Sequence, residues 1–250
     1  TNLNLIVYHI FCTGNYLDVV RNQIERLKSS GLYDWCDKLE VTCINVDEDF
    51  KSTEALFEGM DKVNFNKFVQ NEYEYQPITK AWEYSQKNSG KVLYFHSKGV
   101  SNQYKTFESK EPSEWKIKGV NFWKELMEYF LIDNYQDCLS KLDSYDQCGL
   151  TLNNKWWWGN FWWANLSWLK DNPRPSGGSR WVFEDWINNK RTPRAYEWHH
   201  FDWNPYYTYL PLEMFTSPKE SYEVEVKEAF YGSIGEQQDE GKELTERKVV

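Results

Sequence analysis

A short polar turn, His96-Ser97-Lys98-Gly99, directly follows a β-rich run that ends at Phe95. A strand that ends in such a turn is a frequent place to hold a diphosphate, usually with an Asp-x-Asp pair that binds a divalent metal ion. Here His96 and Lys98 replace the acidic pair, and either side chain could neutralise phosphate charge directly. The alternative is that Lys98 is a solvated surface residue, because its position alone is compatible with both interpretations.

Two adjacent carboxylates, Glu184 and Asp185, follow a loop rich in proline and glycine. We expect them at the start of a short helix over residues 183–189. A carboxylate beside a sugar pocket could act as a general base that removes the proton of an acceptor hydroxyl as it attacks an anomeric carbon. The structural alternative is that both charges are stabilised by the dipole at the helix N-terminus.

The most unusual stretch of the chain is Trp156-Trp157-Trp158-Gly159-Asn160-Phe161-Trp162-Trp163-Ala164. Successive side chains on a strand point to opposite faces, so these aromatic residues cannot all face one core. We expect some of the tryptophans to line a cleft. There Gly159 would allow close approach, and Asn160 would offer donors and an acceptor to sugar hydroxyls. The alternative is a purely structural aromatic ridge.

The sequence motifs of several common enzyme classes are absent. The chain has no Walker-type loop, no GxGxxG and no GxSxG, which argues against an NTPase, a dinucleotide oxidoreductase and a serine hydrolase. By residue type, His199-His200 with Asp202 could bind a metal. Adjacent histidines share neither a helical nor a strand face, however, so we do not expect a metal there.

The elements that would position these residues alternate along the first half of the chain. Apolar strands alternate with helical patterns, which predicts a doubly wound, mostly parallel sheet that binds ligands outside the carboxyl ends of its strands. We therefore expect a nucleotide in this half. The predicted strands cover residues 3–11, 39–46, 63–69 and 91–95, and the predicted helices cover residues 16–29 and 78–86, the second opened by Pro77.

The second half has a less regular pattern. Residues 115–142 have helical spacing over a length that suggests two helices or one bent helix. Residues 148–152 could form another strand, and residues 171–179 form a loop. We predict one domain over residues 1–216. The composition then changes, and residues 217–250 are expected to be an extension that is either disordered or the start of another module.

Bulk composition limits the possible partners. The 250 residues are 40% hydrophobic, which suits one large α/β domain. A net charge of −9 argues against nucleic acid, whose binding relies on cations that neutralise phosphates. Aromatic residues make up 18% of the chain, an excess that favours carbohydrate or nucleotide binding over a simple core. A protein-binding surface or an aromatic core is the alternative.

The cysteines and the hydropathy pattern suggest a location. The chain has five cysteines and no CxxC pair, so we expect buried thiols in a reducing compartment rather than a disulfide framework. No apolar run approaches the roughly 20 residues of a membrane span. We therefore expect a soluble, cytoplasmic protein.

Four motifs together resemble a family of GT-A type glycosyltransferases of bacteria, plants and large viruses, which includes a chlorella-virus glycosyltransferase domain. The resemblance covers about residues 3–215. It rests on the order and spacing of Asn71-Glu72-Tyr73-Glu74-Tyr75, Tyr94-Phe95-His96-Ser97-Lys98-Gly99-Val100, Gly159-Asn160-Phe161-Trp162-Trp163-Ala164 and Arg180-Trp181-Val182-Phe183-Glu184-Asp185-Trp186-Ile187.

The resemblance implies a GT-A (Rossmann-like) α/β domain with a mixed, mostly parallel central sheet flanked by helices. It also implies a nucleotide-diphosphate-sugar donor, such as a UDP-sugar, and a glycan acceptor. Glu184 and Asp185 are then the candidate catalytic residues. The predicted donor-binding residues are His9, Thr13, Thr79, His96, Ser97, Lys98, Gly159, Asn160 and Trp162.

Three questions stay open at this level. No clear Asp-x-Asp is present at the expected strand end, because Asp47-Glu48-Asp49 lies after the second strand, which leaves dependence on manganese or magnesium undecided. Inversion and retention of the anomeric configuration are both possible, although a base at Glu184 or Asp185 favours inversion. The competing functions are a carbohydrate-binding protein without catalysis and a phage enzyme that glycosylates modified DNA bases, and the acidic charge argues against the second. For a viral protein the compartment would be the host cytoplasm.

Overall fold

The computed structural model of the chain has two compact units. The first comprises Thr1–Val100 and Met127–Phe201, and the second comprises Ser101–Leu126 and Asp202–Val250. All of the predicted site residues belong to the first unit. The structure describes residues 1–100, 114–202, 212–216, 224–227 and 246–249.

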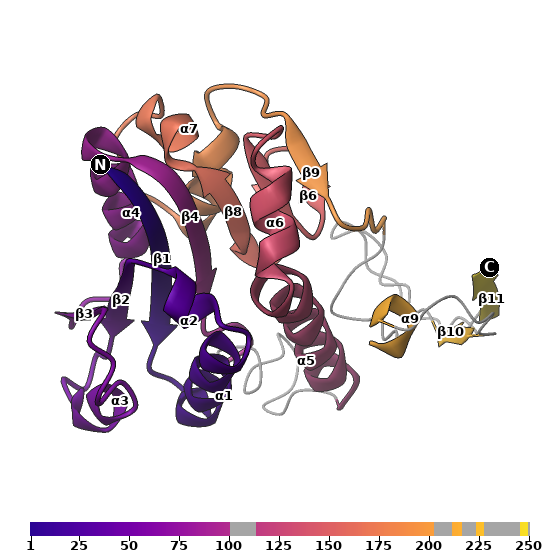
Figure 1. Cartoon of the computed structure of the whole chain (residues 1–250). Helices are drawn as coiled ribbons and strands as arrows, with labels where there is room; N and C mark the ends of the chain where they lie inside the picture. Colours follow the sequence, from indigo (N-terminus) through magenta and orange to yellow (C-terminus); the bar gives the residue numbers. More distant parts are fainter. Residues whose placement is uncertain (101–113, 203–211, 217–223, 228–245, 250) are drawn as a thin grey trace. The chain divides into compact units, whose positions relative to one another are not determined.

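The first unit is built on a seven-stranded mixed sheet with the order β3-β2-β1-β4-β8-β5-β9 (Figure 1). The first four strands are parallel to one another, β8 is antiparallel to both of its neighbours, and β5 and β9 are parallel. The predicted α/β class with a mostly parallel sheet is confirmed. The strands are β1 (Asn2–Phe11), β2 (Lys38–Ile44), β3 (Val63–Phe68), β4 (Ser89–His96), β5 (Gln147–Gly149), β8 (Trp162–Asn165) and β9 (Ala195–Glu197).

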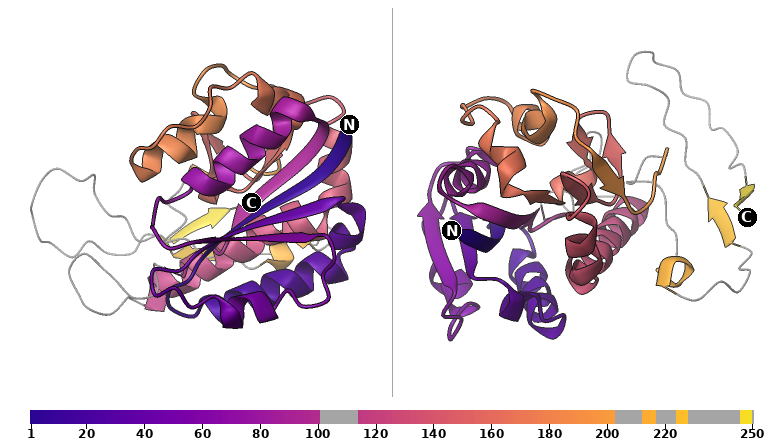
Figure 2. Two further views of the ribbon diagram at one scale, coloured as in Figure 1. Left: turned by 90° about the vertical axis from the view of Figure 1, so that its left-hand side faces the viewer. Right: turned by 45° about the horizontal axis from the view of Figure 1, so that its top comes forward.

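Helices α1 (Tyr16–Ser29) and α4 (Tyr75–Lys87) cover opposite faces of this sheet (Figure 2). On the α1 face, the Tyr8 hydroxyl donates to Gln23 Oε1 at 2.6 Å. On the α4 face, alternate residues of the strands join the buried core, as the period of two along a strand requires. These core residues are Leu5, Val7, Val92 and Tyr94, which cluster with Ile78 and Ala81 of α4.

The strand order creates a switch point between β1 and β4. From β1 the chain passes through α1 to β2 on one side, whereas α4 brings it back from β3 to β4 on the other side. Open α/β sheets bind ligands in the crevice outside the carboxyl ends at such a point. His9 and His96 are register partners across it. On each strand the histidine is the last of the alternate residues whose side chains face α4: His9 follows Val7 on β1, and His96 follows Tyr94 on β4.

Most of the remaining predicted elements are present with shifted boundaries. Residues 114–141 form two helices joined by a π-helical turn over Tyr129–Asp133, as one of the two alternatives predicted. The predicted strand at residues 148–152 is split between β5 and β6. The other elements are α2 (Leu32–Trp35), α3 (Lys51–Ala55), α5 (Glu114–Glu128), α6 (Tyr135–Lys141), β6 (Leu152–Asn153), β7 (Trp156–Trp157), α7 (Leu166–Lys170), α8 (Arg180–Asp185) and two 3₁₀ turns, Trp158–Asn160 and Trp186–Asn188.

Four of the five tryptophans in the tryptophan-rich segment belong to the core and cannot line the expected cleft, whereas Trp156 is half-buried. Trp157, Trp162 and Trp163 are fully buried, and Trp158 is only 4% exposed. Trp162 joins the cluster on the α4 face, whereas Trp163 packs edge-on against Trp35 with ring centroids 5.5 Å apart. Strand β8 is central in the sheet and buried on both faces, which explains consecutive large apolar residues.

In the second unit, α9 (Glu213–Thr216) is followed by β10 (Val224–Lys227) and β11 (Glu246–Val249), which pair in antiparallel orientation. Most of residues 217–250, the predicted extension, lies outside the described residues. Within the described part of the chain, no helix has the length and apolar character needed to cross a membrane.

Candidate functional site

The turn after β4 is anchored to the end of β1. The backbone N–H of Ser97 donates to His9 O at 2.9 Å, and the Ser97 hydroxyl accepts from the Phe11 N–H at 3.1 Å. The Lys98 N–H turns back to His96 O at 2.7 Å. Ser97 is therefore a structural tie between the two strands of the switch point, and it places Lys98, only 5% exposed, directly beyond them.

The two histidines at the switch point are neutral. Burial lowers the pKa of His9 to about 4, against a smaller opposing effect of its bond to Thr42. Burial, together with the charge of Lys98, holds the pKa of His96 well below its usual value. His96 therefore carries no positive charge in this structure, and the expected contact of His96 or Lys98 with a diphosphate stays a prediction.

Each imidazole has its tautomer set by a carbonyl oxygen, which can only accept. His9 Nδ1 lies 3.0 Å from the Thr42 hydroxyl, which can donate or accept, and 3.1 Å from Thr42 O, which can only accept; the carbonyl favours the proton on Nδ1 and a lone pair on Nε2. His96 Nε2 lies 2.6 Å from Gly159 O, so in this ring Nε2 carries the proton. The pair therefore presents acceptor nitrogens on neutral rings at the carboxyl edge of the sheet.

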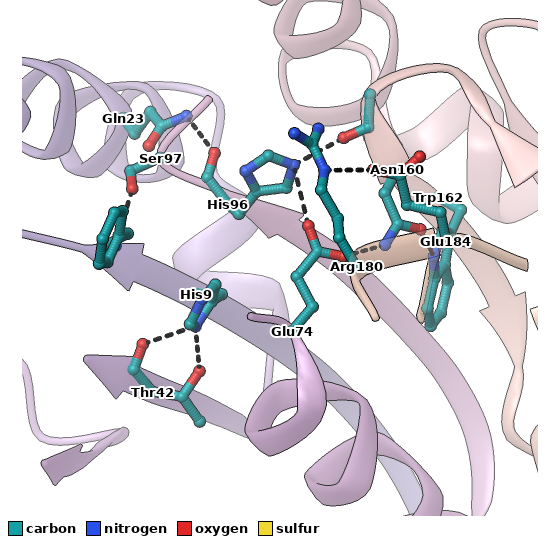
Figure 3. A network of polar contacts seen from close by, with 12 residues as sticks. His9, Gln23, Thr42, Glu74, His96, Ser97, Asn160, Trp162, Arg180 and Glu184 are labelled. Atoms are coloured by element: carbon teal, nitrogen blue, oxygen red, sulfur yellow. Dashed lines mark hydrogen bonds and ion pairs between the residues drawn. The ribbon is translucent and has the colours of Figure 1, made fainter. Parts of the chain in front are cut away.

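Glu74 is the centre of the polar network in Figure 3. It occupies the N-cap position of α4, yet its side chain makes no cap hydrogen bond. Instead one carboxylate oxygen accepts from the Asn160 amide, and the other lies 3.7 Å from His96 Nε2. With a side chain 13% exposed, Glu74 has a pKa raised to about 7, first by burial and then by the negative charge of Glu184.

A tight turn delivers the Asn160 side chain. Gly159 and Asn160 have φ values of 62° and 55°, a left-handed conformation that glycine adopts readily and asparagine tolerates better than most residues. The Trp162 indole N–H donates to Asn160 Oδ1 at 3.0 Å, which leaves the amide N–H₂ to bond Glu74. Because Trp162 is fully buried, it positions Asn160 rather than contacting a ligand itself.

Glu184 lies at the end of its helix, so the prediction that it opens a helix is wrong. Helix α8 starts at Arg180, three residues earlier than expected, with Ser179 at the N-cap, and the predicted loop at residues 171–179 is confirmed. The helix dipole therefore does not account for this carboxylate. Arg180 Nε donates to Glu184 Oε1 at 2.8 Å, one helical turn away. Asp185 is half-buried, and its side chain bonds to no group among the described residues.

These groups form an electrostatically coupled set. The charge of Glu184 raises the pKa of Glu74, whereas Arg180 and Lys98 lower it. Two carboxylates in different environments, one beside an arginine and one buried next to neutral polar groups, are typical of acid–base sites. The structure thus joins four segments that the sequence presents separately: the end of β4, the start of α4, the turn before β8 and the end of α8.

Two predicted donor-binding residues, Thr13 and Thr79, lie outside the hydrogen-bond network around Glu74. Thr13 is in the loop after β1, where its N–H donates to Phe11 O at 3.0 Å. Thr79 is on α4 and 7% exposed, and no described group hydrogen-bonds its buried hydroxyl oxygen. Neither residue contacts Glu74 or Glu184 through a hydrogen bond.

Sequence reasoning assigned no role to Glu74 or Arg180, although both belong to motifs singled out above. Glu74 had a usable signal, since it lies at the start of a helix that returns to the next predicted strand, β4. Arg180 precedes Glu184 by four residues, the spacing at which helical side chains pair. Their convergence with Asn160 depends on tertiary structure.

Metal ligands are not grouped in the described part of the chain, where no three His, Cys, Asp or Glu side chains converge on one point. At the other candidate, His200 Nδ1 lies 3.1 Å from Glu197 Oε1, and burial lowers the pKa of His199.

A hollow of about 380 Å³ lies at the other end of the parallel strands, beside their amino termini, and is lined by Asn2, Ser89 and Lys91 among others. Its charged group is already used, because Lys91 Nζ bonds Leu139 O at 2.8 Å and Asp143 at 2.7 Å. This hollow lies at the amino ends of the parallel strands, away from the switch point. It is therefore the weaker candidate.

No family model matches the chain, and no curated protein matches its sequence. The candidate site consequently rests on its own geometry: neutral histidines, a buried lysine and two coupled carboxylates at the switch point of a mostly parallel sheet.

Proposed function

We propose that this chain is a glycosyltransferase with a GT-A type domain. It would move a sugar from a nucleotide-diphosphate-sugar, such as a UDP-sugar, to a hydroxyl group of a glycan. The observation that carries the proposal is the coupled pair Glu74 and Glu184 near the carboxyl ends of β1 and β4, at the switch point of the sheet. That edge is the expected nucleotide position in such a sheet, and the pair offers the proton transfer that an acceptor hydroxyl requires.

The donor would lie across the ends of β1 and β4. Lys98, which follows the β4 turn, would face the diphosphate, because its ammonium group acts as a compact positive charge. Lys98 already influences the pKa of both Glu74 and His96, so its charge is close to the reacting groups. The lone pair on His9 Nε2 would accept a hydrogen bond from a sugar or ribose hydroxyl.

Glu74 would be the base. As the acceptor oxygen attacks the anomeric carbon, its O–H bond breaks and the proton moves to the Glu74 carboxylate. The bond from the anomeric carbon to the diphosphate oxygen breaks at the same time, and its electron pair leaves with the nucleotide diphosphate. Attack from the side opposite the leaving group inverts the anomeric configuration. A pKa near 7 suits this role, since a base works best when its pKa is close to the working pH.

Glu184 would then keep its charge beside Arg180 and raise the proton affinity of Glu74. This assignment refines the expectation that Glu184 itself is the base. The two assignments differ in one measurable respect. If Glu184 acts through Glu74, its loss moves the pH dependence of turnover; if Glu184 is the base, its loss removes turnover altogether.

Exposed aromatic side chains flank both carboxylates and favour a sugar acceptor. Tyr73, 47% exposed, directly precedes Glu74, and Trp181, 67% exposed, lies on α8 with Glu184. Large exposed apolar groups in a folded domain frequently mark binding surfaces. Aromatic rings offer flat apolar faces on which a sugar ring can stack, and the Trp181 ring lies 5.7 Å from the guanidinium carbon of Arg180, the ion-pair partner of Glu184.

The first test is calorimetric titration with UDP, GDP and their sugar conjugates, each with manganese and again with EDTA. We expect tight binding of one nucleotide class and at least tenfold weaker binding by Lys98→Ala. Lys87→Ala, which removes an exposed lysine at the far end of α4, should bind like the wild type. Glycan binding without any nucleotide binding would identify a carbohydrate-binding protein instead, and salt-sensitive DNA binding would favour the DNA-modifying alternative.

A further inference from the structure

Two thiols lie in contact at the end of the two central parallel strands. Cys12 directly follows β1, and Cys43 is in β2, the strand beside it in Figure 1. Their sulfur atoms are 3.4 Å apart. The backbone holds them in place, since the Cys12 N–H donates to Ile44 O at 2.9 Å. A disulfide bond is about 2.0 Å long, so the two sulfurs would have to approach by only about 1.4 Å.

The two thiols differ in access. Cys12 is half-buried and Cys43 is fully buried. Cys12 Sγ also lies 3.7 Å from Thr53 Oγ1, which in turn donates to the Tyr16 hydroxyl at 3.3 Å. Contact with Cys43, and more weakly with Thr53 and Tyr16, lowers the pKa of Cys12 in spite of partial burial. Cys12 is thus the more accessible and the more acidic member.

The pair lies on the sheet face opposite the candidate site. Cys43 is the register partner of Ile10, which shares its face with Tyr8 and therefore with α1. His9 and His96 point to the α4 face. None of the groups that make up the polar network around Glu74 touches either thiol through a hydrogen bond. The chemistry of the pair is therefore independent of the proposed transferase activity.

We propose that Cys12 and Cys43 are a redox-active dithiol that a hydroperoxide converts to an intramolecular disulfide. The Cys12 thiolate attacks the peroxide, the O–O bond breaks, and Cys12 becomes a sulfenic acid while the other oxygen leaves as water or an alcohol. Cys43 then attacks the Cys12 sulfur, an S–S bond forms, and the sulfenic oxygen leaves as water with the Cys43 proton. The two sulfurs lose two electrons in total, and the peroxide gains them.

The order of the two steps follows from the same contact. The pKa of Cys43 is raised, mainly by its hydrogen bond to Cys12 and secondly by burial. Oxidation of Cys12 removes the thiolate that keeps Cys43 protonated, so Cys43 becomes a competent second nucleophile after the first step. The bond would join the segment just before Thr13 to β2 and tie the loop after β1 to the sheet.

The chain contains a matched control. Cys138 and Cys148 also interact with one another, and this contact raises the pKa of Cys148, but both thiols are fully buried. Cys138 Sγ additionally donates to Phe130 O at 3.2 Å. Because peroxide has no access to either sulfur in the folded protein, this pair should stay reduced under conditions that oxidise Cys12.

The test is to treat the reduced, folded chain with hydrogen peroxide and to quench it with an alkylating reagent, followed by peptide mass spectrometry. We expect the loss of two hydrogen atoms, a cross-link between the peptides of Cys12 and Cys43, full recovery with a thiol reductant, and alkylation of Cys138 and Cys148 only after unfolding. Cys43→Ser should stop at a Cys12 sulfenic acid that dimedone traps, and Cys12→Ser should leave Cys43 unoxidised.

Two results would overturn the proposal. In the first, Cys12 of the wild type accumulates as sulfenic or sulfinic acid while Cys43 stays a free thiol. The contact between the two sulfur atoms would then not lead to a disulfide bond. The other is a wild-type chain in which Cys12 oxidises no faster than Cys138. Both are read from the wild-type protein, so they do not depend on whether either variant folds.

Discussion

Two buried carboxylates show how neighbours decide the proton affinity of a residue. Glu40 is fully buried, but it accepts from Asn64 and Asn66 at 2.9 Å and also from the Tyr84 hydroxyl. Burial alone would raise its pKa, yet these bonds outweigh burial and lower it. Glu74 has Asn160 as its hydrogen-bond donor and Glu184 as a nearby negative charge, so its pKa rises to about 7. Glu74 is therefore the carboxylate prepared to exchange a proton near neutral pH.

This difference predicts how the pH dependence of turnover responds to mutation. Activity that needs ionised Glu74 should rise with pH through about 7. Glu184→Gln removes a negative charge and should move that rise to lower pH, whereas Lys98→Ala removes a positive charge and should move it to higher pH. Glu74→Gln should lower turnover by a factor of about 100 or more. The measurement is initial nucleotide release across pH values, at saturating donor.

The exposed Glu72, two residues earlier in the same segment, provides the control. It accepts a hydrogen bond from Gln76 at 2.5 Å and lies outside the network around Glu74. Glu72→Gln should keep both the rate and the pH profile of the wild type. Shifts in the same direction for Glu184→Gln and Lys98→Ala would contradict the electrostatic coupling. Complete loss of turnover in Glu184→Gln, with Glu74→Gln still active, would return the base to Glu184.

Among the secondary-structure elements, the tryptophan-rich segment packs against β5 because a glycine, Gly149, leaves space for the Trp157 ring. Gly149 of β5 faces Trp157, and a Cβ atom at this position would lie 2.3 Å from ring atom Cε3. The indole is held from its other side, since its N–H donates to Gln147 Oε1 at 2.7 Å. Gln147 and Asn188 bond one another in turn at 2.7 Å. This buried network links β5 to the turn after α8 and so supports the helix that carries Glu184.

We expect Gly149→Ala to lower the free energy of unfolding by about 2 kcal/mol or more, because the fully buried indole cannot move away without breaking its hydrogen bond. Chemical denaturation followed by tryptophan fluorescence measures this difference. Gly177→Ala is the control, since a Cβ there meets no atom within 4 Å, and its effect should stay within about 0.5 kcal/mol. Equal effects in the two variants would show that the ring adapts to the added methyl group.

For the whole molecule, the shifted pKa values of Glu74 and His9 make the free energy of unfolding depend on pH in opposite directions. The pKa of Glu74 is higher in the folded chain, at about 7, than the ordinary value of 4.5. Its favourable contribution is present below about 4.5 and is lost as the pH rises through about 7. The pKa of His9 is lowered from 6.5 to about 4, so the unfolded chain takes up its proton first and stability falls as the pH decreases through this range.

The contribution of Glu74 can be isolated by mutation. As the pH rises from about 4.5 to 7, the wild type should lose stability relative to Glu74→Gln, by up to roughly 3 kcal/mol. Denaturant titrations at a series of pH values measure the difference. For Glu40→Gln the pH dependence should have the opposite sign. The lowered pKa of Glu40 makes the wild type more stable than this variant, and that difference in stability disappears as the pH falls below 4.5. A difference between the wild type and Glu74→Gln that does not change with pH would contradict the raised pKa.

Local sequence patterns were enough to predict the secondary-structure elements and the α/β class. The helix at residues 16–29 and the strands around His9 and His96 were predicted within one or two residues of their observed ends. The reason is physical: apolar alternation and helical spacing are local properties, and a strand–helix alternation leads to a parallel sheet with its ligand edge at the carboxyl ends. The polar turn at His96-Ser97-Lys98 was placed correctly by the same reasoning.

Which polar residues act together, and in what protonation state, depends on contacts that exist only in the folded chain. Glu74, Asn160 and Glu184 come from three distant segments, and the raised pKa of Glu74 depends on burial and on the charge of Glu184. The same holds for the neutral state of His96 and for the burial of Trp162, because strand β8 lies inside the sheet, covered on both faces. Local patterns specify backbone geometry, whereas proton affinity and solvent access depend on groups that folding brings together.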